Sequence, residues 1–144
     1  MIHSILVVCV GNICRSPTGE GLLKRALPNK RVASAGLSAL VGHPADGTAS
    51  DVAMQHGLSL EGHQAQQFTA ELAREFDLIL VMEKKHIDRI THIDPAARGK
   101  TMLIGHWLNQ IEIADPYKRS REAFEAVYGL LENATQKWVN VLSR

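Results

Sequence analysis

One cysteine and one arginine near the N-terminus have the side chains and the spacing for chemistry on an anion. Cys9 is followed by five residues and then by Arg15, within residues 9–17, which read CVGNICRSP. A loop of this length can curl so that its backbone N–H groups point inward and the guanidinium closes the ring, which makes a nest for an anion. A thiolate beneath that anion suits nucleophilic displacement at phosphorus. The spacing therefore predicts phosphoryl transfer through a phosphocysteine.

The segments on either side of this loop predict a strand before it and a helix after it. Residues 5–9 are apolar and rich in β-branched side chains, which is typical of a strand buried on both faces of a parallel sheet. Ser16 and Pro17 predict a helix start, with Ser16 as the N-cap and the proline at the first helical position. A helix N-terminus and the nearby Arg15 both favour a thiolate, so we expect Cys9 to be ionised at neutral pH.

A structural interpretation of the same loop has to be weighed against the functional one. A cysteine and an arginine at this spacing also occur by chance, and a buried cysteine at the end of a strand usually serves as a small apolar filler. The context favours function, because Gly11 and Asn12 accept positive φ and the predicted strand and helix flank the loop.

A carboxyl group far downstream can supply the proton donor that such a reaction needs. Expelling a phenolate requires a general acid on the leaving side, because the phenol has a pKa of about 10. Asp115 stands before Pro116 and Tyr117 in a predicted loop, residues 105–117, that leaves the carboxyl edge of the predicted sheet. We therefore predict that Asp115 is the general acid. The alternative is an ordinary Asp-Pro turn.

Length and composition place the chain among ordinary globular domains. Its 144 residues predict one domain, residues 1–144, with an apolar fraction of 45% and a charged fraction of 22%. The net charge of +1 gives no reason to expect a nucleic-acid partner. No apolar stretch is long enough to span a bilayer, and the first residues lack the features of a signal peptide. We expect a cytoplasmic monomer without membrane insertion.

Cysteine and histidine usage predicts neither a disulfide framework nor a metal site. The chain has two cysteines, both within residues 9–17, and this excludes a disulfide scaffold and a four-cysteine zinc site. The seven histidines show no paired ligand spacing. We therefore expect no metal and no other cofactor.

Strand and helix patterns alternate along the whole chain. Buried-strand patterns occupy residues 5–9, 31–36, 77–82 and 100–104, and helical patterns occupy residues 17–27, 46–55, 69–74 and 83–93. A long amphipathic helix ends the chain, and its core face is predicted to carry Phe124, Val127, Leu131, Ala134, Trp138 and Val141.

This alternation predicts the fold class. The expected fold is a doubly wound, flavodoxin-like α/β domain, in which a four-stranded parallel sheet has helices on both faces. Ligands bind such sheets outside the carboxyl ends of the strands, where the loop after residues 5–9 falls. Residues 61–67 contain no motif that we can interpret.

Taken together, these residues resemble the low-molecular-weight protein tyrosine phosphatase family. The resemblance rests on residues 9–17 (CVGNICRSP) and residues 115–117 (DPY). Residues 34–36 (SAG) and 42–45 (GHPA) also look like the second strand and the substrate loop of that family, so the likeness covers essentially the whole chain. The family implies the activity of a protein tyrosine phosphatase.

The resemblance also implies a role for individual residues. Cys9 would be the nucleophile, Arg15 the clamp for phosphate and transition state, and Asp115 the acid and then the base for water. Ser16 would hydrogen-bond the Cys9 sulfur, and Asn12 would hold the loop in its strained shape. The implied substrate-binding residues are Val10, Gly11, Asn12, Ile13, Cys14, Ser16, Leu40 and Tyr117.

One further implication concerns oxidation. Cys14 would sit where it can trap oxidised Cys9 as a reversible disulfide, which is plausible chemistry for a reactive thiol. Whether that disulfide forms is left open by the sequence.

Two departures from the family pattern suggest a branch and a partner. Leu40 stands where many members have an aromatic residue in the substrate loop, and Lys118 and Arg119 replace a second aromatic residue after Tyr117. This pattern looks like the bacterial branch that acts on tyrosine autokinases controlling capsule and exopolysaccharide export. The implied substrate is the phosphorylated, tyrosine-rich tail of a membrane-bound autokinase. Lys118, Arg119 and Arg121 as readers of an acidic phosphopeptide are a hypothesis.

Three other functions have to be considered. A thiol-dependent arsenate reductase has the same fold and anion loop, but it needs further cysteines to relay a disulfide, and none follows Cys14. A non-catalytic binding module for phosphate or phosphotyrosine needs neither Cys9 nor Asp115. Nucleotide hydrolysis is disfavoured because no Gly-Lys-Ser/Thr loop is present.

Overall fold

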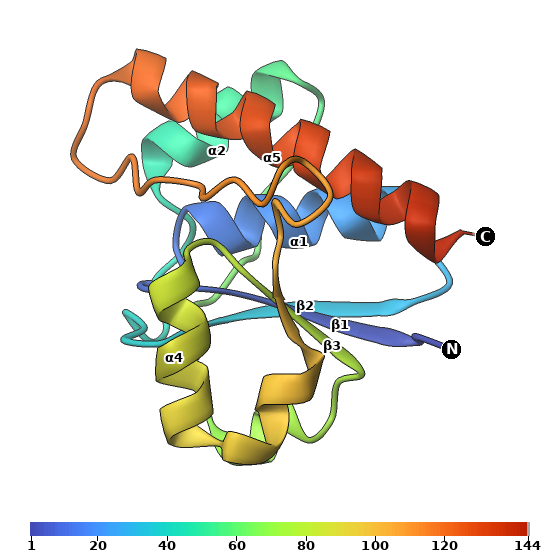
Figure 1. Ribbon diagram of the computed structural model, residues 1–144. Coiled ribbons are helices and arrows are strands. Elements are labelled where there is room, and N and C mark those ends of the chain that lie inside the picture. Colours follow the sequence, from blue (N-terminus) through green and yellow to red (C-terminus); the bar gives the residue numbers. More distant parts are fainter. Residues whose placement is uncertain (144) are drawn as a thin grey trace.

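Four parallel strands form the central sheet of the computed structural model, which describes residues 1–143 (Figure 1). They are β1 (Ser4–Cys9), β2 (Arg31–Gly36), β3 (Leu78–Val81) and β4 (Thr101–Leu103), and their order across the sheet is β2-β1-β3-β4. The chain therefore moves to one side of β1 and then crosses to the other side, so the topological switch point lies at the carboxyl end of β1. This arrangement confirms the predicted fold class.

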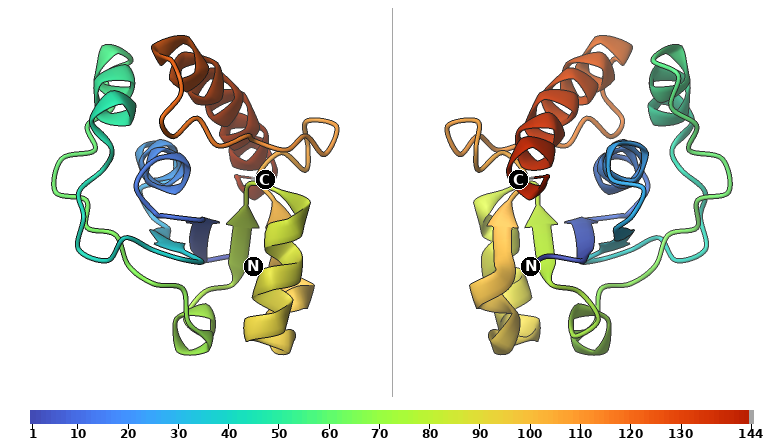
Figure 2. Two further views of the ribbon diagram at one scale, coloured as in Figure 1. Left: turned by 90° about the vertical axis from the view of Figure 1, so that its left-hand side faces the viewer. Right: turned by 90° about the vertical axis from the view of Figure 1, so that its right-hand side faces the viewer.

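Helices cover both faces of the sheet (Figures 1 and 2). One face carries the helices whose side chains share a core with alternate residues of β1: α1 (Arg15–Ala26), α2 (Gly47–Gln55) and α5 (Arg121–Leu142). The other face carries α3 (Ala70–Ala73), α4 (Lys84–Ile93) and a short 3-10 helix, η1 (Pro95–Lys100). Because successive side chains of a strand point to opposite faces, β1 contributes to both cores.

The core face of α5 matches its sequence pattern except near its end. Phe124, Val127, Leu131, Ala134 and Trp138 are buried, whereas Val141 is half-buried near the end of the helix. The Trp138 indole N–H also donates to the Ile104 carbonyl over 2.9 Å, so this side chain joins α5 to the segment after β4. Trp138 is a packing residue, as its position in the pattern indicates.

The start of α1 differs from the prediction. Cys14, not Ser16, occupies the N-cap position, and no side chain caps the helix there. Ser16 lies inside the first turn, and its hydroxyl is used elsewhere: it accepts a hydrogen bond from the Asn12 amide and lies 2.9 Å from the Cys9 sulfur. The predicted N-cap was therefore wrong because a tertiary contact takes the hydroxyl that a cap would use.

The strands on the β3 and β4 side are shorter than their apolar patterns. The pattern at residues 100–104 shortens to β4 (Thr101–Leu103), because Lys100 belongs to η1 and its ammonium group donates to the carbonyls of Ala73 and Phe76. No pattern in the sequence predicted η1 itself.

Candidate active site

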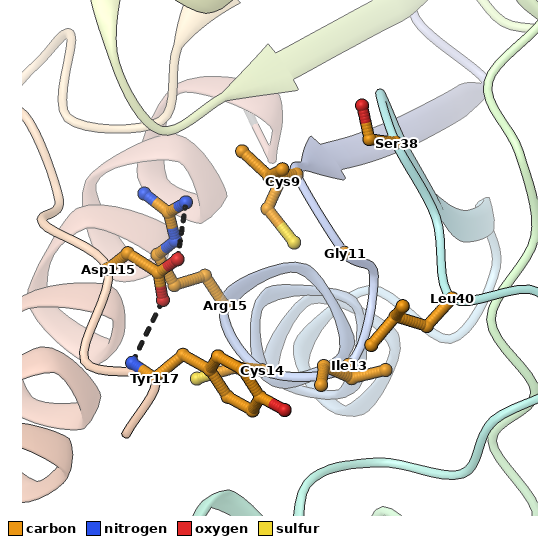
Figure 3. A pocket seen from close by; sticks show the side chains of 10 residues that line it. Cys9, Gly11, Ile13, Cys14, Arg15, Ser38, Leu40, Asp115 and Tyr117 are labelled. Atoms are coloured by element: carbon orange, nitrogen blue, oxygen red, sulfur yellow. Dashed lines mark hydrogen bonds and ion pairs between the residues drawn. The ribbon is translucent and has the colours of Figure 1, made fainter. Parts of the chain in front are cut away.

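A pocket of about 200 Å³ opens at the carboxyl end of β1, which is the predicted place (Figure 3). The residues 9–16, here called the Cys9 loop, form its floor, and α1 begins beneath it. The segment after β2 and the segment before α5 contribute its walls. The lining residues are Cys9, Val10, Gly11, Ile13, Cys14, Arg15, Ser38, Leu40, Asp115 and Tyr117.

The backbone of the Cys9 loop is turned so that its carbonyl groups point away from the pocket. The carbonyls of residues 9–11 accept N–H groups from the segment after β2 over 2.9–3.1 Å, and the Ile13 carbonyl accepts the Asp46 N–H over 2.7 Å. Within the described chain, no N–H group of residues 10–14 donates to a protein acceptor. A loop with its carbonyls bound on the outside and its N–H groups free on the inside is built to hold an anion.

Asn12 keeps the loop in this shape. Its φ of 59° is in the left-handed region, which a residue other than glycine rarely adopts. Its side chain is fully buried, accepts the Gln66 N–H over 2.9 Å and donates to the hydroxyls of Ser16 and Ser34 over 2.8 and 3.0 Å. The Asn12 carbonyl also accepts a hydrogen bond from His63 Nε2 over 2.6 Å. These four contacts hold a backbone conformation that is unfavourable by itself.

The Cys9 sulfur lies at the base of the loop, next to a hydroxyl that can donate to it. Cys9 Sγ and Ser16 Oγ are 2.9 Å apart. Ser16 Oγ already accepts the hydrogen bond from Asn12, so its own hydrogen is available to a second partner. The sulfur at 2.9 Å is a closer partner than the Ala35 carbonyl, which lies 3.5 Å away. The serine can therefore stabilise negative charge on Cys9.

The Arg15 side chain is buried and is held in place by two hydrogen bonds. It is 2% exposed, and its Nη1 donates to Glu83 Oε2 and to the Ile113 carbonyl, each over 2.7 Å. Burial by itself raises the pKa of Glu83, but the hydrogen bond and the charge of Arg15 outweigh it and lower that pKa below its usual value. Glu83 is thus a carboxylate that fixes one end of the guanidinium, while Nη2 points toward Asp115.

Asp115 and Tyr117 belong to one tight turn at the mouth of the pocket. Asp115 Oδ1 accepts the Tyr117 N–H over 3.0 Å, and Asp115 Oδ2 lies 3.7 Å from Arg15 Nη2 (Figure 3). The Asp115 side chain is 47% exposed, so its carboxyl group can be reached by an entering substrate. Tyr117 and Leu40 are partly exposed at the rim and offer apolar surface to an entering ring.

Cys14 differs from Cys9 in its surroundings. Burial raises the pKa of the Cys14 thiol well above its usual value, and the neighbouring Cys9 and Asp115 raise it further. Both cysteines are free thiols in the structure. Cys14 is therefore a neutral thiol beside the predicted nucleophile.

The structure brings together most of the residues predicted from the sequence. Cys9, Arg15 and Asp115 meet in the pocket, although Asp115 lies about a hundred residues away along the chain. Asn12 and Ser16, predicted among the substrate-binding residues, do not line the pocket. Both belong to the Cys9 loop, but they are buried. Their contacts match the roles that the family resemblance implied, namely holding the loop and bonding the sulfur.

Sequence reasoning missed several residues that support the site. His63 and Gln66 lie in the polar segment that had no recognisable motif, and they bond the Cys9 loop from outside. Glu83 and Gly36 were not singled out either. A Cβ at Gly36 would come within 2.5 Å of the Val10 carbonyl oxygen, so glycine is required where the loop packs on the end of β2.

Clusters of metal-ligating side chains and membrane-spanning helices are both absent from residues 1–143. Residues 1–143 contain no cluster of three or more histidine, cysteine, aspartate or glutamate side chains that could hold a metal ion. None of their helices has both the length and the apolar character needed to cross a membrane.

Known proteins share this sequence and this arrangement. Residues 4–144 match the model of the family described as low molecular weight phosphotyrosine protein phosphatase. The chain is 58% identical over 143 residues to the low molecular weight protein-tyrosine-phosphatase Wzb of Escherichia coli strain K12, covering 99% of this chain and 97% of that protein.

Solved structures of tyrosine phosphatases have the same fold as this chain. The crystal structure of the Erwinia amylovora tyrosine phosphatase AmsI matches with a TM-score of 0.98 and 71% identity, over 100% of this chain and 95% of that one. Vibrio vulnificus Wzb in complex with benzylphosphonate matches with a TM-score of 0.94 and 54% identity, over 95% of this chain and 97% of that one. The chain therefore belongs to the low molecular weight phosphotyrosine protein phosphatase family, and it is a protein-tyrosine-phosphatase.

Proposed function

We propose that this enzyme hydrolyses phosphotyrosine in proteins through a phosphocysteine intermediate on Cys9. The observation that carries the proposal is the convergence, in one pocket, of a thiol, a ring of free N–H groups, a guanidinium bound to Glu83 and a carboxyl group. Each of these groups has a task in displacement at phosphorus. Binding alone would need only the ring of N–H groups and Arg15.

The first chemical step forms the intermediate. Cys9 Sγ attacks the phosphorus, the bond between phosphorus and the phenolic oxygen breaks, and Asp115 gives its proton to that oxygen. The free N–H groups of residues 10–14 and the guanidinium of Arg15 bind the three other phosphate oxygens, on which negative charge is spread in the transition state.

The second step regenerates the enzyme. The Asp115 carboxylate takes a proton from water, the water oxygen attacks the phosphorus, and the bond between sulfur and phosphorus breaks. The Ser16 hydroxyl, 2.9 Å from the sulfur, stabilises the thiolate as it leaves. Asp115 acts first as acid and then as base, so one carboxyl group serves both steps.

The rim of the pocket suits an aromatic leaving group. Leu40 and Tyr117 present apolar surface at the opening, where the ring of a phosphotyrosine would lie above a phosphate bound in the loop. A relative, Vibrio vulnificus Wzb, has been crystallised with benzylphosphonate, which also joins an aromatic ring to a phosphorus group. Arsenate reduction is disfavoured by the lack of any cysteine after Cys14.

We further propose that the substrate is the tyrosine-rich tail of a membrane-bound autokinase that controls capsule or exopolysaccharide export. One supporting observation is the similarity to AmsI and Wzb. The other is the presence of Leu40, Lys118 and Arg119, which resemble the pattern of the bacterial branch described above. The proposal assigns the enzyme to the cytoplasm. It also treats residues 1–144 as one domain that works as a monomer, because a single chain supplies every group of the site.

A metal chelator is expected to leave the hydrolysis of p-nitrophenyl phosphate unchanged. The reason is that side chains and backbone N–H groups fill every role in the two steps. Vanadate, which mimics the transition state at phosphorus, is expected to compete with substrate. Steady-state rates with and without chelator, and at several vanadate concentrations, check both results. Loss of activity that added metal restores would contradict the mechanism.

Lys118 and Arg119 are expected to favour acidic phosphopeptides. Both are exposed beside Tyr117, and neither forms an ion pair with residues 1–143, whereas Arg121 pairs with Glu125 on α5. Lys118 Nζ lies 5.6 Å from the centre of the Tyr117 ring, at the rim of the pocket. Lys118 is thus the first cation that a group flanking the phosphotyrosine would meet.

Lys118→Gln is expected to lower kcat/KM about two- to fivefold for an acidic phosphopeptide at low salt, and to leave p-nitrophenyl phosphate unaffected. Arg121→Gln is the matched control, because that side chain is exposed but already paired. An equal loss on a neutral phosphopeptide would remove Lys118 from the recognition of acidic groups.

A further inference from the structure

A buried histidine that the mechanism does not use lies next to the arginine clamp. His86 is in the first turn of α4 and is 1% exposed. Its ring contacts Glu83, the residue that holds Arg15. A fully buried imidazole at this position calls for a physical explanation, because histidine is not among the side chains that usually fill a core.

The hydrogen bonds of His86 define which nitrogen carries the proton. Its Nδ1 accepts the Glu83 N–H over 3.2 Å, so in the neutral ring the hydrogen is on Nε2. Nε2 lies 3.5 Å from Glu83 Oε2 but has no hydrogen-bond partner among residues 1–143. Buried donors without a partner are rare in folded proteins.

The same carboxylate oxygen connects His86 to Arg15. Glu83 Oε2 accepts a hydrogen bond from Arg15 Nη1 over 2.7 Å, and the same oxygen lies 3.5 Å from His86 Nε2. The imidazole therefore lies behind a carboxylate whose other neighbour is the phosphate clamp. A shift of the guanidinium toward a bound phosphate would weaken one hydrogen bond to Glu83 and leave this oxygen in need of a donor.

The charges around His86 keep it neutral. Burial and then the charge of Arg15 lower the pKa of His86 to about 4, and Lys85 and Arg89 act in the same direction. The Glu83 carboxylate acts in the opposite direction and raises the pKa of His86, but its effect is smaller than that of burial and of Arg15. The neutral ring adds no positive charge to the pair of Arg15 and Glu83, and its Nε2–H remains a donor.

We propose that His86 is a positioning residue for phosphate binding, which acts by holding the Glu83 carboxylate while Arg15 changes partners. In the free enzyme Glu83 holds Arg15. When Arg15 turns toward the phosphate oxygens, the His86 Nε2–H becomes the donor to Glu83 Oε2. This inference rests on the proposed function of Arg15 as the phosphate clamp.

Two substitutions separate this role from simple capping of α4. In His86→Asn the amide oxygen can replace Nδ1 as the acceptor for the Glu83 N–H, but the side chain is too short to place a donor where Nε2 lies. In His86→Gln the longer side chain can place an N–H near the position of Nε2. His92→Asn is the matched control, because His92 is on the same helix and exposed.

We expect His86→Asn to weaken binding of inorganic phosphate and of vanadate about three- to tenfold, which corresponds to the net contribution of one typical hydrogen bond. KM for p-nitrophenyl phosphate should rise by a similar factor, with kcat changed less. His86→Gln should recover most of the affinity, and His92→Asn should match wild type. Phosphate affinity measured by calorimetry does not require turnover. The comparison of affinities would therefore still test the role of His86 if the phosphocysteine mechanism were wrong.

A spectroscopic measurement on the unmodified enzyme supplies a second test. The proton resonance of His86 Nε2–H, observed with ¹⁵N-labelled protein, is expected to move downfield when phosphate saturates the pocket. A resonance that stays in place would overturn the proposal, whatever the folding of the variants. Equal phosphate affinity in wild type and His86→Asn would overturn it as well.

Discussion

Cys9→Ser is expected to lower kcat for aryl phosphates by at least about 10⁴-fold. A serine hydroxyl is a far weaker nucleophile than a thiolate, and the hydroxyl of Ser16, which is hydrogen-bonded to the group at position 9, is not a base. The fold should be retained, because the change replaces one buried sulfur by a smaller oxygen. Steady-state rates with p-nitrophenyl phosphate, together with phosphate affinity, measure the effect.

Cys14→Ser is the matched control for this loss. Cys14 is the other cysteine of the same loop and is held as a neutral thiol by burial, so its replacement should leave most of the turnover. Cys9→Ser should still bind phosphate, because the N–H groups of residues 10–14 and Arg15 remain. Turnover that survives in Cys9→Ser would show that the sulfur is not the nucleophile.

The second large effect concerns Asp115, and it depends on the leaving group. For phenyl phosphate, Asp115→Asn is expected to lower kcat about 10²- to 10⁴-fold, because the phenolate then leaves without a proton. A substrate with an acidic leaving group should lose far less in that step. The substituted amide can keep the turn, since its oxygen can still accept the Tyr117 N–H that Asp115 Oδ1 accepts now.

Asp94→Asn is the matched control for Asp115→Asn. Asp94 also precedes a proline, and its Oδ1 accepts the Ala96 N–H over 3.2 Å in a similar turn at the start of η1, outside the pocket lining. It should leave the rates on both substrates unchanged. If Asp115→Asn reduced kcat/KM, which reports on formation of the phosphoenzyme, by the same factor for both substrates, Asp115 would have no role in protonating the leaving group.

The parts of the site that could be predicted are those with a local signature. The Cys9 loop carries the predicted nucleophile and its arginine in one short stretch between a buried strand and a helix, so spacing and periodicity were enough to single it out. Asp115 was found by a rule about sheets, because loops after parallel strands meet at the same edge. The structure confirms that these groups meet.

The supporting contacts could not be predicted, because they join segments far apart in the chain. Glu83 lies 68 residues from Arg15, and His63 lies 51 residues from Asn12. The partner of His63 is a backbone carbonyl, which has no signature in the sequence. The same reason explains the error at Ser16, whose local sequence is that of an N-cap but whose hydroxyl is taken by the loop.

The rim of the pocket contains the residues by which this chain departs from the general family pattern. Leu40 and Tyr117 leave room for an aromatic ring, and Lys118 stands just outside them with a φ of 62°. A left-handed lysine is an uncommon conformation, and it is held here by the turn in which the Arg119 N–H donates to the Pro116 carbonyl over 2.8 Å. The proposed general acid, Asp115, and Lys118 therefore belong to one turn, so changes in this turn are expected to affect both the proposed chemistry and the proposed recognition.

Direct detection of the phosphoenzyme tests the central claim most sharply. The enzyme is mixed with an aryl phosphate, quenched in acid within one turnover, digested and examined by mass spectrometry. The account predicts up to one phosphoryl group per chain, located on Cys9, formed before steady state and absent from Cys9→Ser. In Asp115→Asn, with an acidic leaving group, the intermediate should accumulate because the base for water is lost. Product release without phosphate on Cys9, at every quench time, would contradict the account.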